Sequence, residues 1–289
     1  MEGLKKGTIT RADTDGFTVV SDNLFFRCRS RGNLKKNGGI APGDAVLFSD
    51  GVIEKVLPRK NLFSRPRVAN ADIILAVVSP LPKPDFYTLD KILVNAEVQN
   101  VPVAIVVNKS DTDSAIYEEI KSEYSAAAEN IISFSAKTGE GKETLAELLK
   151  GKLAVLAGNS AVGKTSLVNA LLGFDLKTGD YSEKILRGRQ TTAYSEIFFG
   201  KHNDCEIMIA DTPGFAAIDA NVKAEDLPEC YPEYFNVSGE CRFRGCTHVT
   251  EPDCKVKELV SEGKLSSARY ERYKSIYEEL SERRDYERR

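Results

Sequence analysis

The chain has 289 residues, of which 42% are hydrophobic and 29% are charged, as in globular proteins with a substantial core. No apolar run approaches the roughly 20 residues that a membrane-spanning helix needs. No apolar stretch of a secretory signal follows the segment Met1–Lys6. These features argue against a membrane protein and favour a cytoplasmic one, and the length predicts two or three domains. We also expect the protein to be a monomer.

Charge is distributed unevenly along the chain. Residues 1–67 carry 13 Lys and Arg against 7 Asp and Glu, a net charge of +6. Residues 68–220 carry 14 Lys and Arg against 21 Asp and Glu, a net charge of −7. Residues 221–289 carry 13 Lys and Arg against 15 Asp and Glu, a net charge of −2. The secondary-structure pattern changes near the same positions, so we predict three domains with these boundaries. A basic first domain on an acidic body indicates contact with a polyanion.

Residues 1–67 are predicted to form a small β-barrel of the OB type. Turn signals at Asp15-Gly16, Asn37–Gly39 and Pro42–Asp44 separate short apolar runs. About five strands in a segment of this length fit such a barrel. The predicted strands are Gly7–Thr10, Phe17–Val20, Leu24–Cys28, Ala45–Phe48 and Val52–Val56.

The third of these strands interleaves aromatic and basic side chains. Phe25 and Phe26 precede Arg27, Arg29 and Arg31. OB-folds use such faces to stack bases and to follow phosphates, so this strand is a candidate RNA-binding face. The alternative is that Phe25 or Phe26 belongs to the core and that the arginines form a solvated face.

Residues 68–220 alternate apolar runs with helical patterns, which predicts an α/β sheet with ligand loops at the carboxyl ends of its strands. Helices are expected at Asp90–Gln99 and Thr165–Leu172. The predicted strands are Ile73–Val78, Val103–Val107, Ile131–Phe134, Leu153–Ala157 and Ile207–Ala210.

A phosphate-binding loop follows the fourth of these strands and opens a helix, which is the context that this motif requires. Its backbone N–H groups can hold phosphates. Lys164 is expected to contact the β- and γ-phosphates, and the Thr165 hydroxyl is expected to bind Mg²⁺. The loop and first helical turn comprise Gly158, Asn159, Ser160, Ala161, Val162, Gly163, Lys164, Thr165 and Ser166.

The motif Asn108-Lys109-Ser110-Asp111 predicts selection of guanine over adenine. The Asp111 carboxylate can accept hydrogen bonds from the guanine N1–H and 2-amino groups, and adenine offers no such pair of donors. A second short motif, Ser135-Ala136-Lys137, is expected to pack on the same base. We therefore predict that the nucleotide is GTP or GDP.

Two further motifs complete the predicted nucleotide site. In Asp211-Thr212-Pro213-Gly214, Asp211 is expected to bind Mg²⁺ through water, and Gly214 is expected to donate its N–H to the γ-phosphate. The segment Gly188–Thr192 is the candidate switch that supplies a threonine to Mg²⁺. Thr192 is favoured for this role, and Thr191 is the alternative.

The order of these motifs differs from that of an ordinary GTP-binding domain, which begins with the phosphate loop. Here the base-reading motifs at 108–111 and 135–137 come first, and the phosphate loop and Asp211 follow. The sequence therefore predicts a circularly permuted GTPase domain whose new chain ends carry the flanking domains.

The cysteine-rich residues 230–254 predict one structural zinc ion. In a cytosolic chain, six cysteines indicate metal ligands or free thiols rather than disulfides. Three thiolates and one imidazole within 14 residues supply a complete tetrahedral set. The predicted ligands are Cys241, Cys246, His248 and Cys254, with Cys230 as a less favoured alternative, while Cys28 and Cys205 are expected to be core thiols.

Helices are predicted after this loop, near residues 255–262 and 266–282. The second has an apolar stripe at helical spacing. We expect this stripe to pack on the neighbouring domain rather than to form a groove for a partner. It consists of Tyr270, Tyr273, Ile276, Tyr277 and Leu280.

The basic OB-like N-terminus, the permuted motif order and the cysteine–histidine cluster resemble the RsgA (YjeQ) family of circularly permuted ribosome-assembly GTPases over nearly the whole chain. The resemblance implies a GTPase that binds the small ribosomal subunit and its rRNA late in maturation and is stimulated by the subunit. Family members usually carry His immediately before the threonine pair of the switch segment, where this chain has Gln190.

Two other functions stay open at this stage. One is a GTP-dependent switch with a protein effector, against which the basic first domain argues. The other is a non-catalytic zinc- and RNA-binding factor that only holds GTP. RNA capture would test the first, and turnover measured with small subunits would test the second.

Many GTPases place a water-orienting Gln directly after Asp-x-x-Gly, but this chain has Phe215 there. A phenyl ring cannot orient water by hydrogen bonding. The Gln190 amide can accept from water and donate to the γ-phosphate. We therefore hypothesise that Gln190 is catalytic, together with Lys164 and Thr192, once the small subunit orders the switch segment.

Gln190→Ala is expected to leave GTP affinity nearly unchanged and to lower the subunit-stimulated rate by ~10²-fold or more, because an aligned water contact is lost. GTP hydrolysis in the presence of purified small subunits measures this effect. A solvent-facing loop residue at this position predicts the opposite result, a variant that is stimulated as strongly as the parent.

Overall fold

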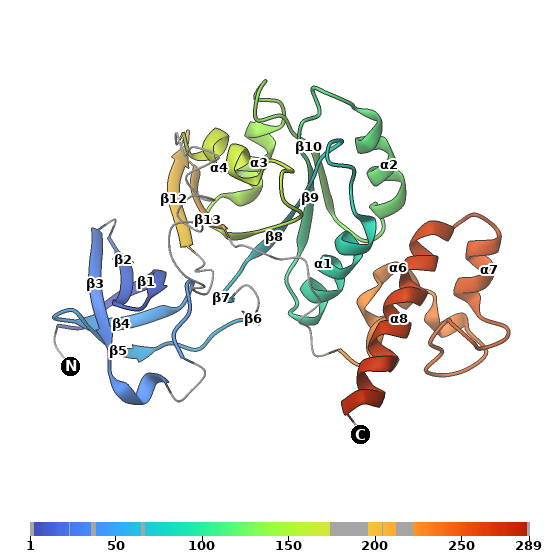
Figure 1. Ribbon diagram of the computed structural model, residues 1–289, viewed down its shortest axis with the longest axis horizontal. Coiled ribbons are helices and arrows are strands. Elements are labelled where there is room, and N and C mark those ends of the chain that lie inside the picture. The colour runs from blue at the N-terminus through green and yellow to red at the C-terminus, as the bar shows by residue number, and fades with distance from the viewer. Residues whose placement is uncertain are drawn as a thin grey trace.

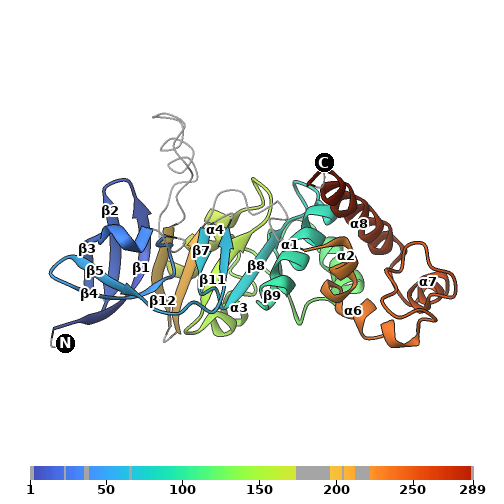
Figure 2. The same cartoon turned by 90° about the horizontal axis from the view of Figure 1, so that it is seen from below.

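A computed structural model of the chain describes residues 3–22, 24–35, 39–64, 67–173, 196–203, 205–211 and 222–287. Three parts follow one another along the molecule: an N-terminal β-barrel, a central α/β part and a C-terminal helical part (Figure 1). Figure 2 shows that the barrel and the C-terminal helices lie at opposite ends. None of the helices in the described ranges combines the length and apolar character needed to cross a membrane.

All five predicted strands of the barrel are confirmed. Because β1 pairs with both β2 and β4, the order β1-β2-β3-β5-β4 closes on itself, as the OB prediction requires. Inward side chains, including those of Ile9, Val19, Phe48 and the thiol of Cys28, form one buried cluster. The strands are β1 (Lys5–Asp13), β2 (Gly16–Ser21), β3 (Leu24–Ser30), β4 (Ala45–Ser49) and β5 (Val52–Val56), with a 3-10 helix at Gly32–Lys35.

The central part is an α/β sheet, as predicted. Its order β10-β9-β8-β11-β13-β12 is parallel except for the antiparallel β12. Apolar side chains of α1 and α2 cover one face, and those of α3 and α4 cover the other. The strands are β8 (Ile73–Val78), β9 (Val103–Val107), β10 (Asn130–Ser133), β11 (Leu153–Ala157), β12 (Glu196–His202) and β13 (Cys205–Asp211). The helices are α1 (Phe86–Val98), α2 (Ala115–Tyr124), α3 (Lys142–Leu149) and α4 (Lys164–Leu172).

Two close contacts join the barrel to the central part, one through the edge strand of the sheet and one through a hairpin that precedes the sheet. Strand β1 pairs with β12 through Arg11 and Glu196, whose side chains also form an ion pair of 3.7 Å. At the second contact, Gly43 has a φ of +89°, and a Cβ there would lie 1.9 Å from the Ala69 carbonyl oxygen. Ala69 lies in the hairpin of β6 (Leu62–Ser64) and β7 (Arg67–Ala69), which connects the barrel to β8. Only glycine allows this approach, so backbone holds the barrel against the hairpin.

The C-terminal part surrounds the cysteine-rich loop with helices. The two predicted helices are confirmed as α7 (Lys255–Ser261) and α8 (Ser267–Glu287), and the short α6 (Pro232–Phe235) lies between 3-10 helices at Ala224–Cys230 and Ser238–Glu240. Val94 of α1 belongs to the same apolar cluster as the α8 stripe, so the stripe packs partly on the neighbouring part, as predicted. Within the stripe, Tyr277 is half-buried and the buried members are Tyr270, Tyr273, Ile276 and Leu280.

Candidate functional site

The phosphate-loop motif forms the turn between β11 and α4. Gly158, Ala161 and Gly163 have φ values of +128°, +65° and +92°. A Cβ on Gly158 would lie 2.2 Å from the Val77 carbonyl oxygen, and one on Gly163 would lie 2.4 Å from the Asn108 amide nitrogen. The two glycines are therefore required both for their positive φ and for the close packing of the loop.

Lys164 begins α4, and its side chain folds back over the loop. Its Nζ donates to the carbonyl oxygens of Gly158 at 2.8 Å and Asn159 at 2.7 Å. Burial lowers the pKa of Lys164, and the negative charge of Asp211, at the end of β13, opposes this shift. The charge of Asp211 therefore acts on the amine at the start of α4, beside the half-buried Thr165, and these groups suit a phosphate with Mg²⁺.

Asn108 fastens the base-reading loop to the phosphate loop. Its buried side-chain amide donates to the carbonyl oxygens of Val162 at 2.9 Å and Gly163 at 3.3 Å. Its Oδ1 accepts from the backbone N–H of Lys109 at 2.8 Å. The Lys109 amine reaches back to the carbonyl oxygen of Ala161 at 2.8 Å. Loops that lie 54 residues apart in sequence are therefore fixed as one unit.

The two loops border one cavity of about 640 Å³, a volume suited to a small-molecule ligand. Asp111 accepts a hydrogen bond of 2.7 Å from Ser135, and the Lys137 amine lies 3.7 Å from its other carboxylate oxygen. The Ser135 hydrogen bond lowers the pKa of Asp111, so this carboxylate is ionised at neutral pH and can accept from a base. Predicted site residues that line the cavity are Asn108, Lys109, Asp111, Ala136, Lys137, Gly163 and Ser166.

Glu140 belongs to this site and was not found from the sequence. Its carboxylate accepts from the Ser133 hydroxyl at 2.6 Å and from the Ser110 hydroxyl at 3.0 Å. It therefore ties the loop of the first base-reading motif to the loop that carries the second. The only sequence signal is its place in the loop after Lys137, and glutamates are common on the surfaces of globular proteins.

Several predicted nucleotide contacts lie outside the described residues, and Asp211 is the last described member of its motif. The roles assigned to them therefore stay predictions. They are Gly188, Arg189, Gln190, Thr191, Thr192, Thr212, Pro213, Gly214 and Phe215.

The four predicted zinc ligands converge in the C-terminal part, with all ligand atoms within 4.8 Å of one another. His248 Nδ1 lies 3.3 Å from the Cys254 sulfur and 3.7 Å from the Cys241 sulfur. The latter two sulfurs are 4.0 Å apart. A tetrahedral zinc with bonds of roughly 2.1–2.3 Å needs separations of about this size. The alternative ligand Cys230 is not a member of this group.

The surroundings of the cluster suit a bound cation. Three of the four side chains are buried, and the fourth is half-buried. Burial raises the pKa of Cys246 to about 12 and lowers the pKa of His248. Zn²⁺ would compensate for the burial of thiolates by supplying positive charge at the centre of the group. The residues therefore fit one structural zinc ion.

Tyrosines of α8 hold the backbone of this loop. The Tyr270 hydroxyl donates to the carbonyl oxygen of His248 at 2.7 Å, and the Tyr273 hydroxyl donates to that of Thr247 at 2.5 Å. Hydrogen bonds from the N–H and hydroxyl of Thr247 also outweigh the effect of burial on Glu251 and lower the pKa of that carboxyl to about 2. The cysteine–histidine cluster and the long C-terminal helix are thus one packing unit.

The structure joins a phosphate loop to a guanine-reading loop, and the guanine-reading loop comes first along the chain. This arrangement defines a circularly permuted GTPase. A sequence model of the family described as RsgA GTPase matches residues 56–221. This chain belongs to the RsgA GTPase family.

Relatives match over nearly the whole length. The "Small ribosomal subunit biogenesis GTPase RsgA" of Agathobacter rectalis is 43% identical over 281 residues, which cover 93% of this chain and 92% of that protein. The protein of the same name from Thermotoga maritima is 40% identical and covers 97% of this chain and 98% of its own.

Two solved structures have the same architecture. The crystal structure of YjeQ from Thermotoga maritima matches with a TM-score of 0.77 and 36% identity, over 96% of this chain and 98% of that one. YloQ, described as a circularly permuted GTPase, matches with a TM-score of 0.74 and 26% identity. This match covers 98% of this chain and 96% of the YloQ chain. The predicted fold and its permutation are confirmed.

Asp111→Asn is expected to change the base preference from guanine to xanthine, because xanthine carries an oxygen where guanine carries the 2-amino group. A hydrogen bond to a charged group contributes about 1.5–3 kcal/mol, which predicts a loss of GDP affinity of roughly 10- to 100-fold. Competition between GDP and XDP measures this change. Asp113→Asn, in the same loop, serves as the control. A preference for GDP in the Asp111 variant would show that this carboxylate does not contact the base.

One zinc ion per chain is expected by elemental analysis. Cys254→Ser should remove the zinc and abolish the cooperative melting of the C-terminal part, because this part has little core without a metal. Cys230→Ser, a buried cysteine of the same part outside the cluster, should keep the metal. A zinc-free preparation whose C-terminal part still melts cooperatively would contradict the assignment.

Proposed function

We propose that this GTPase binds the small ribosomal subunit and acts in its late maturation, and that the subunit stimulates GTP hydrolysis. The observation that carries the proposal is the attachment of a guanine-nucleotide site to a barrel with a basic, aromatic outer strand. Two relatives that match over more than nine-tenths of both chains bear names that state small-subunit biogenesis.

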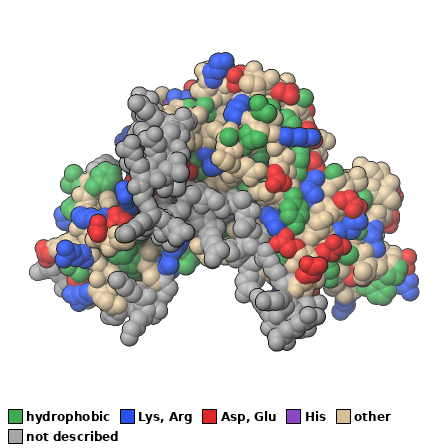
Figure 3. Space-filling model, viewed as in Figure 1, with side chains coloured by type: hydrophobic (Ala, Val, Ile, Leu, Met, Phe, Trp, Pro, Cys, Tyr) green, Lys and Arg blue, Asp and Glu red, His purple; other side chains and the backbone are tan. Residues whose placement is uncertain are grey.

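The outer face of β3 supports contact with RNA. Phe25 is 65% exposed, and Arg27 and Arg29 are exposed at the alternate positions that share its face. Phe26, in contrast, packs against the core ring of Phe48 with centroids 5.1 Å apart. Hydrophobic side chains lie beside Lys and Arg on the barrel in Figure 3. A base can stack on Phe25 while the guanidinium groups contact phosphates.

Not all of the arginines on this barrel are equally available. Arg27 pairs with Asp13, and Arg31 pairs with Glu54 at 2.9 Å. Arg29 forms no ion pair with any residue in the described ranges. We therefore assign the principal phosphate contact of this strand to Arg29.

For the nucleotide, we assign the β- and γ-phosphates to the loop N–H groups and to Lys164. We assign the Mg²⁺ site to Thr165 and Asp211 with Thr192, or with Thr191 as the alternative. Mg²⁺, when bound, neutralises charge on the phosphates. Gly214 donates to the γ-phosphate, and Gln190 orients the attacking water.

We further propose that the C-terminal cluster holds a structural zinc ion and that the partner is contacted through its rRNA. The protein acts as a monomer in the cytoplasm. The functional domains are 1–67, 68–220 and 221–289. The family match ends at residue 221, which supports the second boundary, and begins at residue 56, within the first domain.

The direct test is GTP hydrolysis measured with and without purified small ribosomal subunits, with large subunits as the control. Small subunits should raise the rate, and Lys164→Ala should abolish the stimulated activity. A rate that is indifferent to small subunits, together with retained RNA binding, would favour a factor that only holds GTP. Failure to capture RNA would favour a protein effector.

Combined Phe25→Ala and Arg29→Glu substitutions should weaken subunit binding by about 10-fold or more, because a stacking surface and a phosphate contact are both removed. Binding by the parent should fall steeply with salt, as counterion release requires. Lys150→Glu, an exposed charge reversal at the end of α3, is the matched control. GDP affinity should stay unchanged in both variants, and unchanged subunit affinity in the first would move the interface away from β3.

A further inference from the structure

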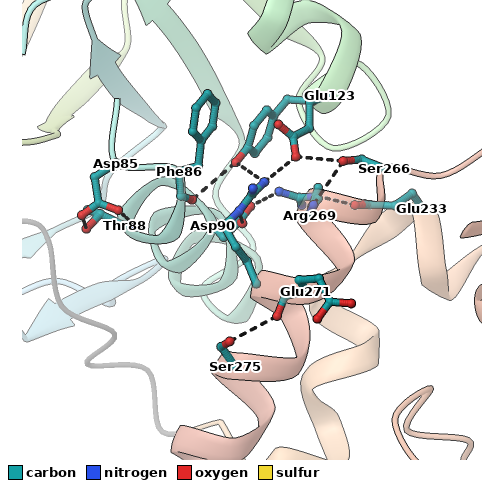
Figure 4. Close-up of polar contacts among 12 residues, drawn as sticks. Asp85, Phe86, Thr88, Asp90, Glu123, Glu233, Ser266, Arg269, Glu271 and Ser275 are labelled. Carbon is teal, nitrogen blue, oxygen red and sulfur yellow. Dashed lines mark hydrogen bonds and ion pairs between the residues drawn. The ribbon is translucent and has the colours of Figure 1, made fainter. Parts of the chain in front are cut away.

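Four helices from two parts of the chain meet in a buried ion cluster (Figure 4). Asp90 of α1 is fully buried and contacts two arginines of α8, Arg269 and Arg272. Arg269 also donates to Glu233 of α6, and Arg272 donates to Glu123 of α2, each at 2.5 Å. Because α1 and α2 belong to the GTPase part while α6 and α8 belong to the zinc-bearing part, this ion cluster joins the two.

Aromatic rings hold both guanidinium groups in place. The Cζ atom of Arg269 lies 4.7 Å from the ring centroids of Tyr124 and Tyr231. That of Arg272 lies 5.3 Å from the ring of Phe86. The buried Arg269 and the half-buried Arg272 share the α1 carboxylate, and removal of that charge would leave both cations incompletely compensated. The position of α8 on α1 is therefore strongly specified.

The N-terminus of α1 packs against the phosphate loop. Asp85 caps the helix and accepts from the Thr88 N–H at 3.1 Å and from its hydroxyl at 2.7 Å. Asp85 and Thr88 line a small cavity together with Gly158 and Asn159. Burial acts to raise the pKa of Asp85, and hydrogen bonds from Thr88 and the Asn159 side chain lower it.

A second link passes through Lys109. Its amine donates to the carbonyl oxygen of Leu81, in the loop that leads into α1, and also to that of Ala161 in the phosphate loop. Asp90 lies five residues after Asp85, or roughly 7–8 Å along the helix axis. About one and a half helical turns thus separate Asp90 from the helix cap that borders the phosphate loop.

We propose that Asp90 is a positioning residue through which the docking of α8 sets α1 and, with it, the phosphate loop. Nucleotide binding and α8 docking are then linked. A nucleotide that orders the phosphate loop strengthens the docking of α8. Conversely, a ligand that binds the C-terminal part in its docked position raises nucleotide affinity by the factor by which nucleotide raises that ligand's own affinity. This inference requires nucleotide binding but no ribosomal partner, so it can fail or hold independently of the proposed function.

The test uses the zinc-loaded full-length chain and measures GDP affinity and amide hydrogen exchange with and without GDP and Mg²⁺. In the parent, GDP should slow exchange in α8 as well as in the phosphate loop. Asp90→Asn keeps the side-chain volume and removes the charge. It should weaken GDP binding by about 5- to 10-fold and abolish the response of α8 to GDP.

Asp44→Asn is the matched control, because Asp44 is a fully buried carboxylate paired with Arg59 in the barrel, away from α1. It should lower barrel stability and leave both GDP affinity and the α8 response unchanged. If Asp90 has only a structural role, the substitution should speed amide exchange in α8 by the same factor with and without GDP. The slowing of α8 exchange on addition of GDP should then be as large as in the parent.

A retained GDP response of α8 in Asp90→Asn overturns the proposal. An α8 exchange rate in the parent that does not change on addition of GDP also overturns it. Arg272→Gln keeps the test available if Asp90→Asn does not fold, because the Arg272 side chain is 17% exposed, at the edge of the cluster. Loss of the α8 response in this variant supports the coupling, and its persistence overturns it.

Discussion

The side-chain amide of Asn108 is the contact on which the nucleotide site depends. One buried amide group satisfies carbonyl oxygens of two residues in a loop that lies 54 residues further along the chain. A buried amide without partners costs about 1–3 kcal/mol, so neither loop can move away without leaving polar groups unpaired. Gly163 permits the contact because it has no Cβ.

Permutation also determines what α1 can contact. The helix follows β8 near the centre of the sheet, and the C-terminal part follows β13 along the chain. That part returns to α1, where Val94 joins its apolar cluster and Asp90 receives its arginines. One short helix therefore packs on the sheet, on the phosphate loop and on the C-terminal helices.

Local patterns were sufficient to predict most of the fold. Alternating apolar positions between turn residues predicted the five barrel strands, and continuous apolar runs predicted the buried strands of the α/β sheet. The zinc cluster was predictable because the spacing of its ligands, Cys241 to Cys254, is itself short. The motif loops were predictable because phosphate and guanine recognition require particular residue types at fixed spacing.

Features that depend on distant residues were not predictable. Asp90 and Arg269 resemble solvent-facing charges in their own helices, and only the packing of α1 on α8 makes them a buried pair. Glu140 has no motif of its own. Sequence alone also could not decide between Phe25 and Phe26, because the direction of each ring is set by strand register within the closed barrel.

Glu196 occupies a position between the barrel and the nucleotide site. It pairs with Arg11 of β1 on one side and with Asp211 of β13 on the other. A rotation of the barrel against the sheet would therefore act on the strand position next to a predicted magnesium ligand. One residue of an edge strand thus links the orientation of the N-terminal barrel to the placement of the Asp211 carboxylate.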